Sequence, residues 1–516
     1  MGPTAGLPPP LAALLEPGAY PHPVDRVELV ETHISWVFLA GDRVYKLKKP
    51  VNLGFLDFTT LDRRRFFCEE EVRLNRRLTH DVYLGVVELR GDGGLRFGGP
   101  GPVREVAVAM RRLPHDRMLD RLVGAGTAPP ELLDDIGHLV ARFHAEAATG
   151  GEIDALGGLP TVRENWEENF AQTAALGPEL LPEAWRAQLR EYVARFLARE
   201  AGRFAARVAA GRSRDCHGDL QAQHVCCTDR IQVFDCIEFN HRFRFGDTAN
   251  EIAFLAMDLD RLGRTDLSLR FVNAYLEESG DYEAVPLLDF YCAYRAFVRG
   301  KVLSFQAAAH PELRAGARAL FRQALDYVAR PHAPRVVITT GVMGSGKSTV
   351  AREVAQRLRA VMMRTDAVRK RLAGVPLRKR HEHAFGEGLY TDAMTERTYA
   401  ETLRIAEETV RAGWAVVIDG SFSTAAERGA ARRLAARLAV PYAALWCDAP
   451  DPVIALRLRG RSTDPREISD GREEILGRHR ARYEPPLGET DVIVLDTAGD
   501  VGAALGSALR RLGAGA

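Results

Sequence analysis

The chain has 516 residues, enough for about two to four domains that each bury a hydrophobic core. Its 70 basic and 69 acidic residues leave a formal charge of +1, so overall charge gives no basis for coating a polyanion or a membrane surface. The seven cysteines include the adjacent pair Cys226 and Cys227 rather than the spacing of zinc ligands, which favours a reducing, cytoplasmic location.

The N-terminal part, residues 1–112, predicts a small sheet-rich lobe. Residues 1–10 lack the basic start of a secretion signal and no long apolar run follows them, so we expect neither export nor a membrane span. The predicted elements of this lobe are two strands, a helix and an apolar run, at 27–40, 43–48, 61–78 and 103–110.

Residues 113–330 predict a larger helical lobe, because their apolar residues recur mostly at helical spacing. A short strand pair around 225–234 interrupts this pattern. Two prolines within 330–334 then mark a linker, and 334–516 is predicted as an α/β domain with a parallel sheet and crossover helices. Its strand-like runs are 336–340, 415–418, 442–447 and 492–495.

Residues 335–358 predict a strand, a glycine-rich turn and a helix, in that order. The turn has the G-x-x-x-x-G-K-S pattern of a P-loop, in which backbone N–H groups and the helix N-terminus bind phosphate. We expect Lys347 to act in catalysis at the β and γ oxygens and Ser348 to ligate Mg²⁺. Lysine makes up only seven of the 70 basic residues, which strengthens the prediction. The predicted nucleotide contacts are Gly341, Gly344, Ser345, Gly346, Lys347, Ser348 and Thr349.

Two carboxylates follow predicted strands of this domain. Asp366 lies at the next strand position, where it is suited to accept the proton of an acceptor hydroxyl, and a helix N-cap is the alternative interpretation. Asp419 ends the apolar run 415–418, as the carboxylate of a Walker B strand does, and would hold the metal through water.

Three arginines, Arg457, Arg459 and Arg461, form either a solvated helix face or a lid over the transferring phosphate. With the P-loop, Asp366 and Asp419, they make residues 334–516 similar to the small P-loop kinases of the gluconate kinase, chloramphenicol phosphotransferase, zeta toxin and polynucleotide kinase group. The resemblance implies phosphoryl transfer to a hydroxyl, with Asp366 as proton acceptor and Arg461 as a catalytic lid residue. It does not identify the acceptor.

In the N-terminal part, the run His217-Gly218-Asp219 precedes a predicted hairpin, and Asp235 follows it. These segments resemble the aminoglycoside phosphotransferase family, whose catalytic loop reads H-G-D-x-x-x-x-N. The resemblance spans about 20–330 and implies a two-lobed, protein-kinase-like fold. It also implies that Asp219 is the catalytic base and that Asp235 is a metal ligand. Lys46 matches the nucleotide-binding lysine and Glu71 its ion-pair partner, with Glu70 as the alternative partner.

This sequence departs from that family at His224, where the family has a metal-ligating asparagine. Mg²⁺ prefers oxygen ligands, so an imidazole at this metal position weakens the site or favours Mn²⁺. Residues 31–40 also lack a glycine that would approach the phosphates. A nucleotide-sensing domain without transferase activity is therefore the alternative for this half.

We therefore expect a two-lobed α+β kinase-like domain followed by an α/β P-loop kinase domain. The predicted function is ATP- and Mg²⁺-dependent transfer of phosphate to a hydroxyl of a small molecule, at the P-loop site and as an option at the second site. The alternatives are a regulatory N-terminal sensor and a kinase that acts on nucleic-acid ends. The expected partners are ATP and a small acceptor, with no membrane.

Overall fold

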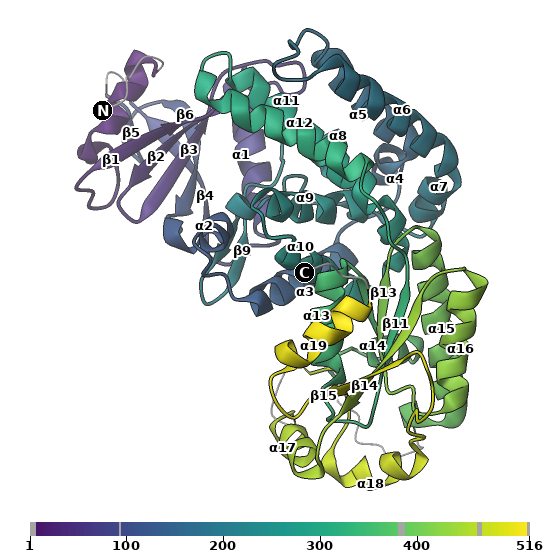
Figure 1. Ribbon diagram of the computed structural model, residues 1–516. Helices are drawn as coiled ribbons and strands as arrows, with labels where there is room; N and C mark the ends of the chain where they lie inside the picture. The colour runs from purple at the N-terminus through teal and green to yellow at the C-terminus, as the bar shows by residue number, and fades with distance from the viewer. Residues whose placement is uncertain (1–6, 92–93, 380–387, 462–466, 513–516) are drawn as a thin grey trace. The chain divides into compact units, whose positions relative to one another are not determined.

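The computed structural model describes residues 7–91, 94–379, 388–461 and 467–512 (Figure 1). The contacts among them divide the chain into two units that alternate along the sequence. Helices α11 (Leu288–Gln306) and α12 (Arg314–Val328) contribute residues to both units. Unit 1 comprises Met1–Ala128, Glu146–Leu262 and Tyr294–Arg322, and unit 2 comprises Pro129–Ala145, Gly263–Ala293 and Gln323–Ala516.

Unit 1 begins with an antiparallel six-stranded sheet in the order β1-β2-β3-β6-β4-β5. Alternate residues of β6 face opposite sides, so Ala107 and Ala109 pack with the N-terminal segment, whereas Val106 and Val108 pack against α1 (Leu61–Asn75). The strands are β1 (Val27–Glu31), β2 (Ser35–Ala40), β3 (Arg43–Lys48), β4 (Tyr83–Arg90), β5 (Arg96–Phe97) and β6 (Val103–Arg111).

The sequence predicts one strand over 27–40, but the structure has two antiparallel strands there, with Val27 opposite Ala40. The chain reverses at Thr32, whose hydroxyl oxygen accepts the Ser35 N–H at 2.9 Å. The Thr32 N–H donates in turn to the Ser35 carbonyl at 2.9 Å. A threonine side chain closes this turn without glycine or proline, so the usual sequence signal for a turn is absent here.

The rest of unit 1 is mainly helical, with two short strand pairs. The predicted strand pair near 225–234 is present as β8 (Val225–Cys227) and β9 (Ile231–Val233). The second pair is β7 (Ser213–Asp215) with β10 (Phe245–Asp247). The helices are α2 (Leu119–Gly124), α4 (Glu152–Gly157), α5 (Leu159–Gln172), α6 (Glu183–Arg199), α7 (Ala201–Ala209), α8 (His241–Arg244) and α9 (Thr248–Arg261).

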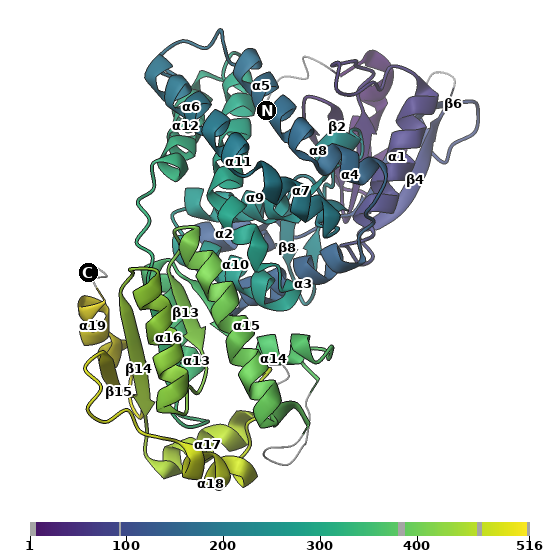
Figure 2. The same cartoon turned by 90° about the vertical axis from the view of Figure 1, so that its right-hand side faces the viewer.

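Unit 2 is built on a parallel five-stranded sheet in the order β12-β13-β11-β14-β15. Figure 2 shows α15 and α16 over one face of this sheet, while α13 and α19 pack together on the other. The strands are β11 (Val336–Thr340), β12 (Val361–Arg364), β13 (Val416–Asp419), β14 (Tyr442–Asp448) and β15 (Val492–Asp496). The helices are α13 (Lys347–Leu358), α14 (Thr365–Leu372), α15 (Asp392–Arg411), α16 (Ala425–Arg437), α17 (Asp451–Arg461), α18 (Glu473–Arg482) and α19 (Val501–Arg511).

Two helices from earlier in the chain belong to unit 2: α10 (Thr265–Ser279) and nearly all of α3 (Pro130–Glu146). Asn273 of α10 satisfies the outer edge of β12, because its amide donates to Ala360 O at 3.2 Å and accepts from Met362 N at 2.9 Å. The edge strand of the sheet is therefore closed by a side chain instead of another strand.

Among the residues that the structure describes, no helix combines the length and the apolar character needed to cross a membrane.

Candidate active sites

The phosphate-binding loop of unit 2 runs from the end of β11 into α13, as the sequence predicts. Its glycines are required by close packing: a Cβ on Gly341 would lie 2.5 Å from the Cys447 carbonyl oxygen. Gly344 adopts φ 78°, and a Cβ there would lie 3.0 Å from side-chain atoms of Ile454 and Leu458. The loop is thus held against β14 and α17 with its shape fixed by the backbone.

Lys347 is the first residue of α13, and its ammonium group donates to Val342 O of the loop at 2.8 Å. Ser348 and Thr349 follow in the first turn of α13, where the helix N-terminus favours anions. His479 of α18 lies near Lys347. Burial and the positive charge of Lys347 lower the pKa of His479 to about 4, so this imidazole is neutral beside the phosphate loop at neutral pH.

Asp419 ends β13, next to the strand that leads into the phosphate loop. Its carboxylate is buried, 3.5 Å from Thr339 Oγ1 and 3.4 Å from Arg364 Nε. The Ser348 hydroxyl and the Asp419 carboxylate are hard oxygen donors, so these residues fit a Mg²⁺ ion bound with the nucleotide. Asp419 would hold the ion through water.

Arg364, the last residue of β12, joins this carboxylate to two others, Glu277 of α10 and Glu467. Its shortest contact is to Glu467 Oε1, at 2.8 Å. Burial disfavours the charged guanidinium, but the three carboxylates outweigh it and raise the pKa of Arg364 above its usual range. This arginine fixes Asp419 relative to the β12–α14 junction.

Asp366 lies in the first turn of α14, directly beyond the carboxyl end of β12. Arg364 occupies the N-cap position, and among the described residues no side chain caps this helix, so Asp366 does not act as the cap. The residue is partly exposed and lies at the carboxyl edge of the sheet, where the phosphate loop also lies.

A group of polar residues surrounds this position. Arg369 is only 7% exposed, donates to Leu389 O at 3.0 Å, and lies 4.9 Å from the Tyr390 ring. Asp470 accepts from the Tyr390 hydroxyl at 2.9 Å and from Lys370 at 3.1 Å. Burial and the Asp366 and Asp470 carboxylates raise the pKa of Tyr390 above its usual range. Sequence reasoning did not assign Tyr390 or Asp470, because only folding brings them beside α14.

Of the three candidate lid arginines, Arg457 lies at the phosphate loop. It donates to Thr497 O, and its Nη1 atom lies 3.4 Å from the position of a Cβ on Gly346. Arg459 is exposed, 3.9 Å from Glu473. Arg461 ends α17, but its side chain lies outside the described residues.

The predicted catalytic loop of unit 1 follows β7 and is fixed by α9. Glu251 accepts the backbone N–H groups of His217 at 3.1 Å and Gly218 at 3.0 Å. Burial raises the pKa of Glu251 to about 7, against the opposing effect of Arg295 and of these N–H groups. Burial and nearby His224 lower the pKa of His217 to about 3, so His217 is neutral, and its Nδ1 atom accepts from Asp219 N at 3.3 Å.

The structure brings the predicted residues of this site together. His224 lies between the two carboxylates, with its Nδ1 atom 3.4 Å from Asp219 Oδ2 and its Nε2 atom 3.6 Å from Asp235 Oδ2. Lys46 contacts Asp235 Oδ1 at 2.7 Å and Glu71 Oε1 at 2.9 Å. Glu70, the alternative partner, instead pairs with an arginine on its own helix.

Sequence reasoning missed a second lysine in the site. Lys48 lies two residues after Lys46 on β3, so both side chains point to the same face. It contacts Glu71 Oε2 at 2.7 Å and also Glu238. The alternation of β3 was a usable signal, since lysine is rare in this chain.

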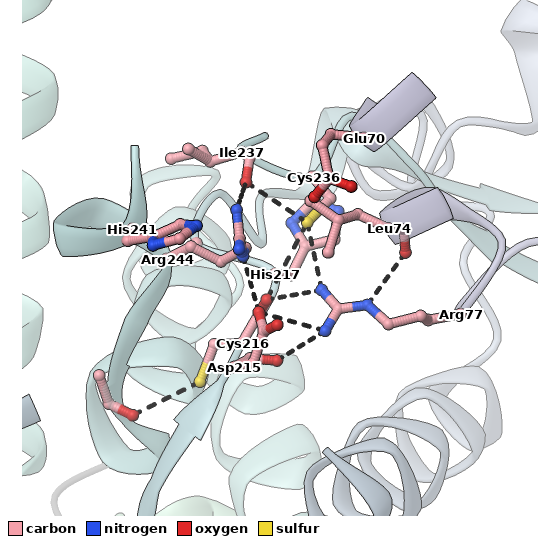
Figure 3. A network of polar contacts seen from close by, with 12 residues as sticks. Glu70, Leu74, Arg77, Asp215, Cys216, His217, Cys236, Ile237, His241 and Arg244 are labelled. Atoms are coloured by element: carbon pink, nitrogen blue, oxygen red, sulfur yellow. Dashed lines mark hydrogen bonds and ion pairs between the residues drawn. The ribbon is translucent and has the colours of Figure 1, made fainter. Parts of the chain in front are cut away.

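Arg77 connects the end of α1 to the catalytic loop of unit 1 (Figure 3). Arg77, just after α1, donates to Asp215 O at 2.8 Å, Cys216 O at 2.9 Å and Cys236 Sγ at 3.4 Å. Asp215 also accepts from Arg244 at 2.7 Å. One guanidinium thus links the segment before Asp219 with the residue after Asp235. All seven cysteines are buried and none forms a disulfide, as expected of small apolar side chains.

A divalent cation at Asp235 would meet an ammonium group at one carboxylate oxygen and an imidazole at the other. Burial disfavours the ionised carboxyl, but Lys46 and then His224 hold the pKa of Asp235 below its usual range. Among the described residues, no group of three or more His, Cys, Asp or Glu side chains is arranged to hold a metal. As it stands, this donor set does not fit a divalent cation.

Comparison with known proteins gives the class of each part. Residues 68–288 match the family model of the phosphotransferase enzyme family, and residues 336–486 match that of an AAA domain. The protein is therefore an ATP-dependent kinase that joins a phosphotransferase-like domain to a P-loop kinase domain.

The chain belongs to the same family as two mycobacterial proteins described only as uncharacterised, from Mycobacterium tuberculosis and Mycobacterium bovis. Each is 35% identical over 467 residues, which cover 89% of this chain and 91% of the relative. Two solved structures resemble parts of it. A gluconokinase from Sinorhizobium meliloti is 23% identical with a TM-score of 0.26, over 36% of this chain and 93% of its own. An aminoglycoside 2'-phosphotransferase is 13% identical with a TM-score of 0.37, over 58% and 93%.

Proposed function

We propose that this kinase transfers the γ-phosphate of ATP to a hydroxyl group of a small molecule at the P-loop site, with Asp366 as the general base. The observation that carries the proposal is the position of Asp366. It lies beyond the carboxyl end of β12, is partly exposed, and does not cap α14. Ligands of open parallel sheets bind beyond this edge, where the phosphate loop also lies.

The residues around the two substrates then have separate roles. Lys347 and the N-terminus of α13 stabilise the negative charge of the transferring phosphate. Ser348 and Asp419 would hold Mg²⁺, which supplies charge neutralisation at the β- and γ-phosphates when bound. Asp366 orients the acceptor hydroxyl and takes its proton as the new O–P bond forms.

Arg369 suggests the class of acceptor. Its guanidinium is buried, and its Nη1 atom donates to two neutral oxygens, Leu389 O and Thr395 Oγ1, whereas its buried Nε–H has no hydrogen-bond partner among the described residues. A buried guanidinium N–H without an acceptor favours a ligand that carries a carboxylate or phosphate oxygen. We therefore propose a hydroxylated acceptor with a carboxylate or phosphate group.

The test is a screen of ATP consumption by the full chain against sugars, sugar acids, nucleosides, aminoglycosides and oligonucleotide ends. Lys347→Ala should lower turnover of any acceptor by about 10²-fold or more, because it removes stabilisation of phosphate charge. Arg357→Ala is the matched control, since it removes an exposed cation from the same helix and should leave turnover unchanged. Near-normal turnover in Lys347→Ala would show that the P-loop is not the catalytic site. Salt-dependent oligonucleotide binding would favour the nucleic-acid alternative.

For unit 1, we propose a nucleotide-sensing role as the second candidate function. The observation that favours it over a second phosphotransferase is the ion pair between Lys46 and Asp235, which engages the expected metal ligand. A sensor predicts that Asp219→Asn leaves the product yield at the P-loop site unchanged. A second transferase predicts that this substitution removes one of two phosphorylated products.

A further inference from the structure

Five charged side chains form one cluster between β3, α1 and the segment after β9. The two lysines share Glu71, because Lys46 contacts its Oε1 atom at 2.9 Å and Lys48 its Oε2 atom at 2.7 Å. Each lysine also has a carboxylate of its own, Asp235 for Lys46 and Glu238 for Lys48.

The two lysines differ in environment. The Lys48 side chain is 1% exposed and lies between two buried carboxylates, so it is an internal part of the fold. The Lys46 side chain is 14% exposed, and its partner Asp235 is 42% exposed. Glu71 has Lys48 as a second partner, so the Lys46 ammonium group can contact Glu71 and Asp235 together.

Both oxygens of Asp235 are engaged by the protein. Lys46 lies 2.7 Å from Oδ1, and His224 lies 3.6 Å from Oδ2. His224 also lies near Asp219. Between the two carboxylates there is therefore an imidazole nitrogen instead of the oxygen ligand that a hard cation prefers. A divalent ion at Asp235 would have to displace Lys46 and accept a nitrogen ligand.

Two contacts from the end of α1 hold the residue that follows Asp235, and Figure 3 shows the one made by Arg77. Asn75 of α1 accepts from Cys236 N at 2.9 Å, and Arg77 reaches Cys236 Sγ at 3.4 Å. Asp235 is therefore fixed relative to α1, the helix that carries Glu71. These contacts hold Asp235 and Glu71, the two partners of Lys46, close together, so the fold itself favours the contact between Lys46 and Asp235.

We propose that the Lys46 ammonium group takes the place of the divalent cation at Asp235 in the kinase-like site. This site then binds no divalent metal, and any nucleotide bound there binds without one. The charges agree, since two ammonium groups against three carboxylates leave one negative charge. Removing Lys46 leaves two, which creates a site that attracts a divalent ion. The inference is independent of phosphoryl transfer at the P-loop.

The experiment uses the full chain with Lys347→Ala and Ser348→Ala, which removes the P-loop nucleotide site. Mn²⁺ binding is measured by electron paramagnetic resonance in three forms: Lys46 retained, Lys46→Met and Lys46→Arg. The methionine keeps the length of the stem without the charge, and the arginine keeps the charge. Lys46→Gln serves in place of Lys46→Met if the latter shows a lowered melting temperature.

The form with Lys46 should show no Mn²⁺ site, and Lys46→Arg should resemble it. Lys46→Met should gain one site that Asp235→Asn removes. In the form with Lys46, the affinity for ATP is measured by calorimetry with Mn²⁺ and again with EDTA. The two affinities should differ by less than about threefold. The proposal is overturned if the form with Lys46 already has a Mn²⁺ site that depends on Asp235. It is equally overturned if Lys46→Met gains none, or if EDTA weakens ATP binding by about tenfold or more.

Discussion

Replacement of Lys48 by methionine should destabilise unit 1 far more than the same change at Lys46. Methionine preserves the apolar stem but removes the ammonium nitrogen, which lies 4.9 Å from the centre of the Phe58 ring. It therefore leaves Glu71 and Glu238 without their shared cation. These carboxylates are 1% and 5% exposed. Removing one partner of a buried ion pair costs about 3–5 kcal/mol.

The change at Lys46 should cost less, because the Asp235 side chain is 42% exposed and can be hydrated, and Glu71 keeps Lys48. The pH dependence gives a second signature. Burial already raises the pKa of Glu238, and loss of Lys48 raises it further. Protonation then relieves the uncompensated charge, so the deficit of Lys48→Met should shrink as the pH falls.

The free energy of unfolding is measured by urea titration with hydrogen-exchange mass spectrometry on peptides from β3 and α1, which isolates this half of the chain. Glu238→Gln combined with Lys48→Met should recover part of the loss, since it removes one unpaired charge. Equal effects of the two lysine substitutions, or a deficit below about 1 kcal/mol for Lys48→Met, would refute the assignment of Lys48 as the buried structural cation.

Two further predictions concern the P-loop half. Asp366→Asn should lower kcat for the acceptor by about 10²-fold while leaving the KM for ATP unchanged, as expected for loss of a general base. A raised KM for ATP with normal kcat would assign Asp366 to nucleotide binding instead. His479 has a pKa of about 4 in the folded protein, so the unfolded chain takes up its proton first. Stability should therefore fall as the pH drops below about 6.5, by about 2 kcal/mol at pH 5 from this group. His479→Gln should remove that part of the pH dependence in urea titrations, and an unchanged acid limb would contradict it.

The parts of the sites that the sequence predicts are those written in contiguous segments. The phosphate loop needs glycines and Lys347 at fixed spacing, so its position between β11 and α13 follows from the local pattern. The loop before Asp219 and the β8–β9 hairpin are likewise local. The functional groups of such a segment lie close together in the sequence, and the surrounding elements only determine where the segment lies in the fold.

The pairings across the chain could not be predicted in this way. Lys46 and Asp235 are separated by 189 residues, and Lys370 and Asp470 by 100. Which buried charge meets which carboxylate depends on how the elements pack, and sequence spacing carries no information on that. The turn at Thr32 was not predicted for a local reason. A threonine side chain stabilises it, so the glycine or proline that usually indicates a turn is absent.

The side chain of Asn273 bears on whether the two halves of this kinase are separable modules. The linker at 330–334 invites dissection there, but a chain that starts after it lacks α10 and with it Asn273 and Glu277. The N–H and C=O groups of β12 would then be open, and exposed strand edges recruit other chains into intermolecular sheets. Arg364 would also lose a carboxylate partner. The P-loop half therefore depends, for the closure of its sheet edge and for its electrostatic balance, on residues of α10 that precede the linker in the sequence.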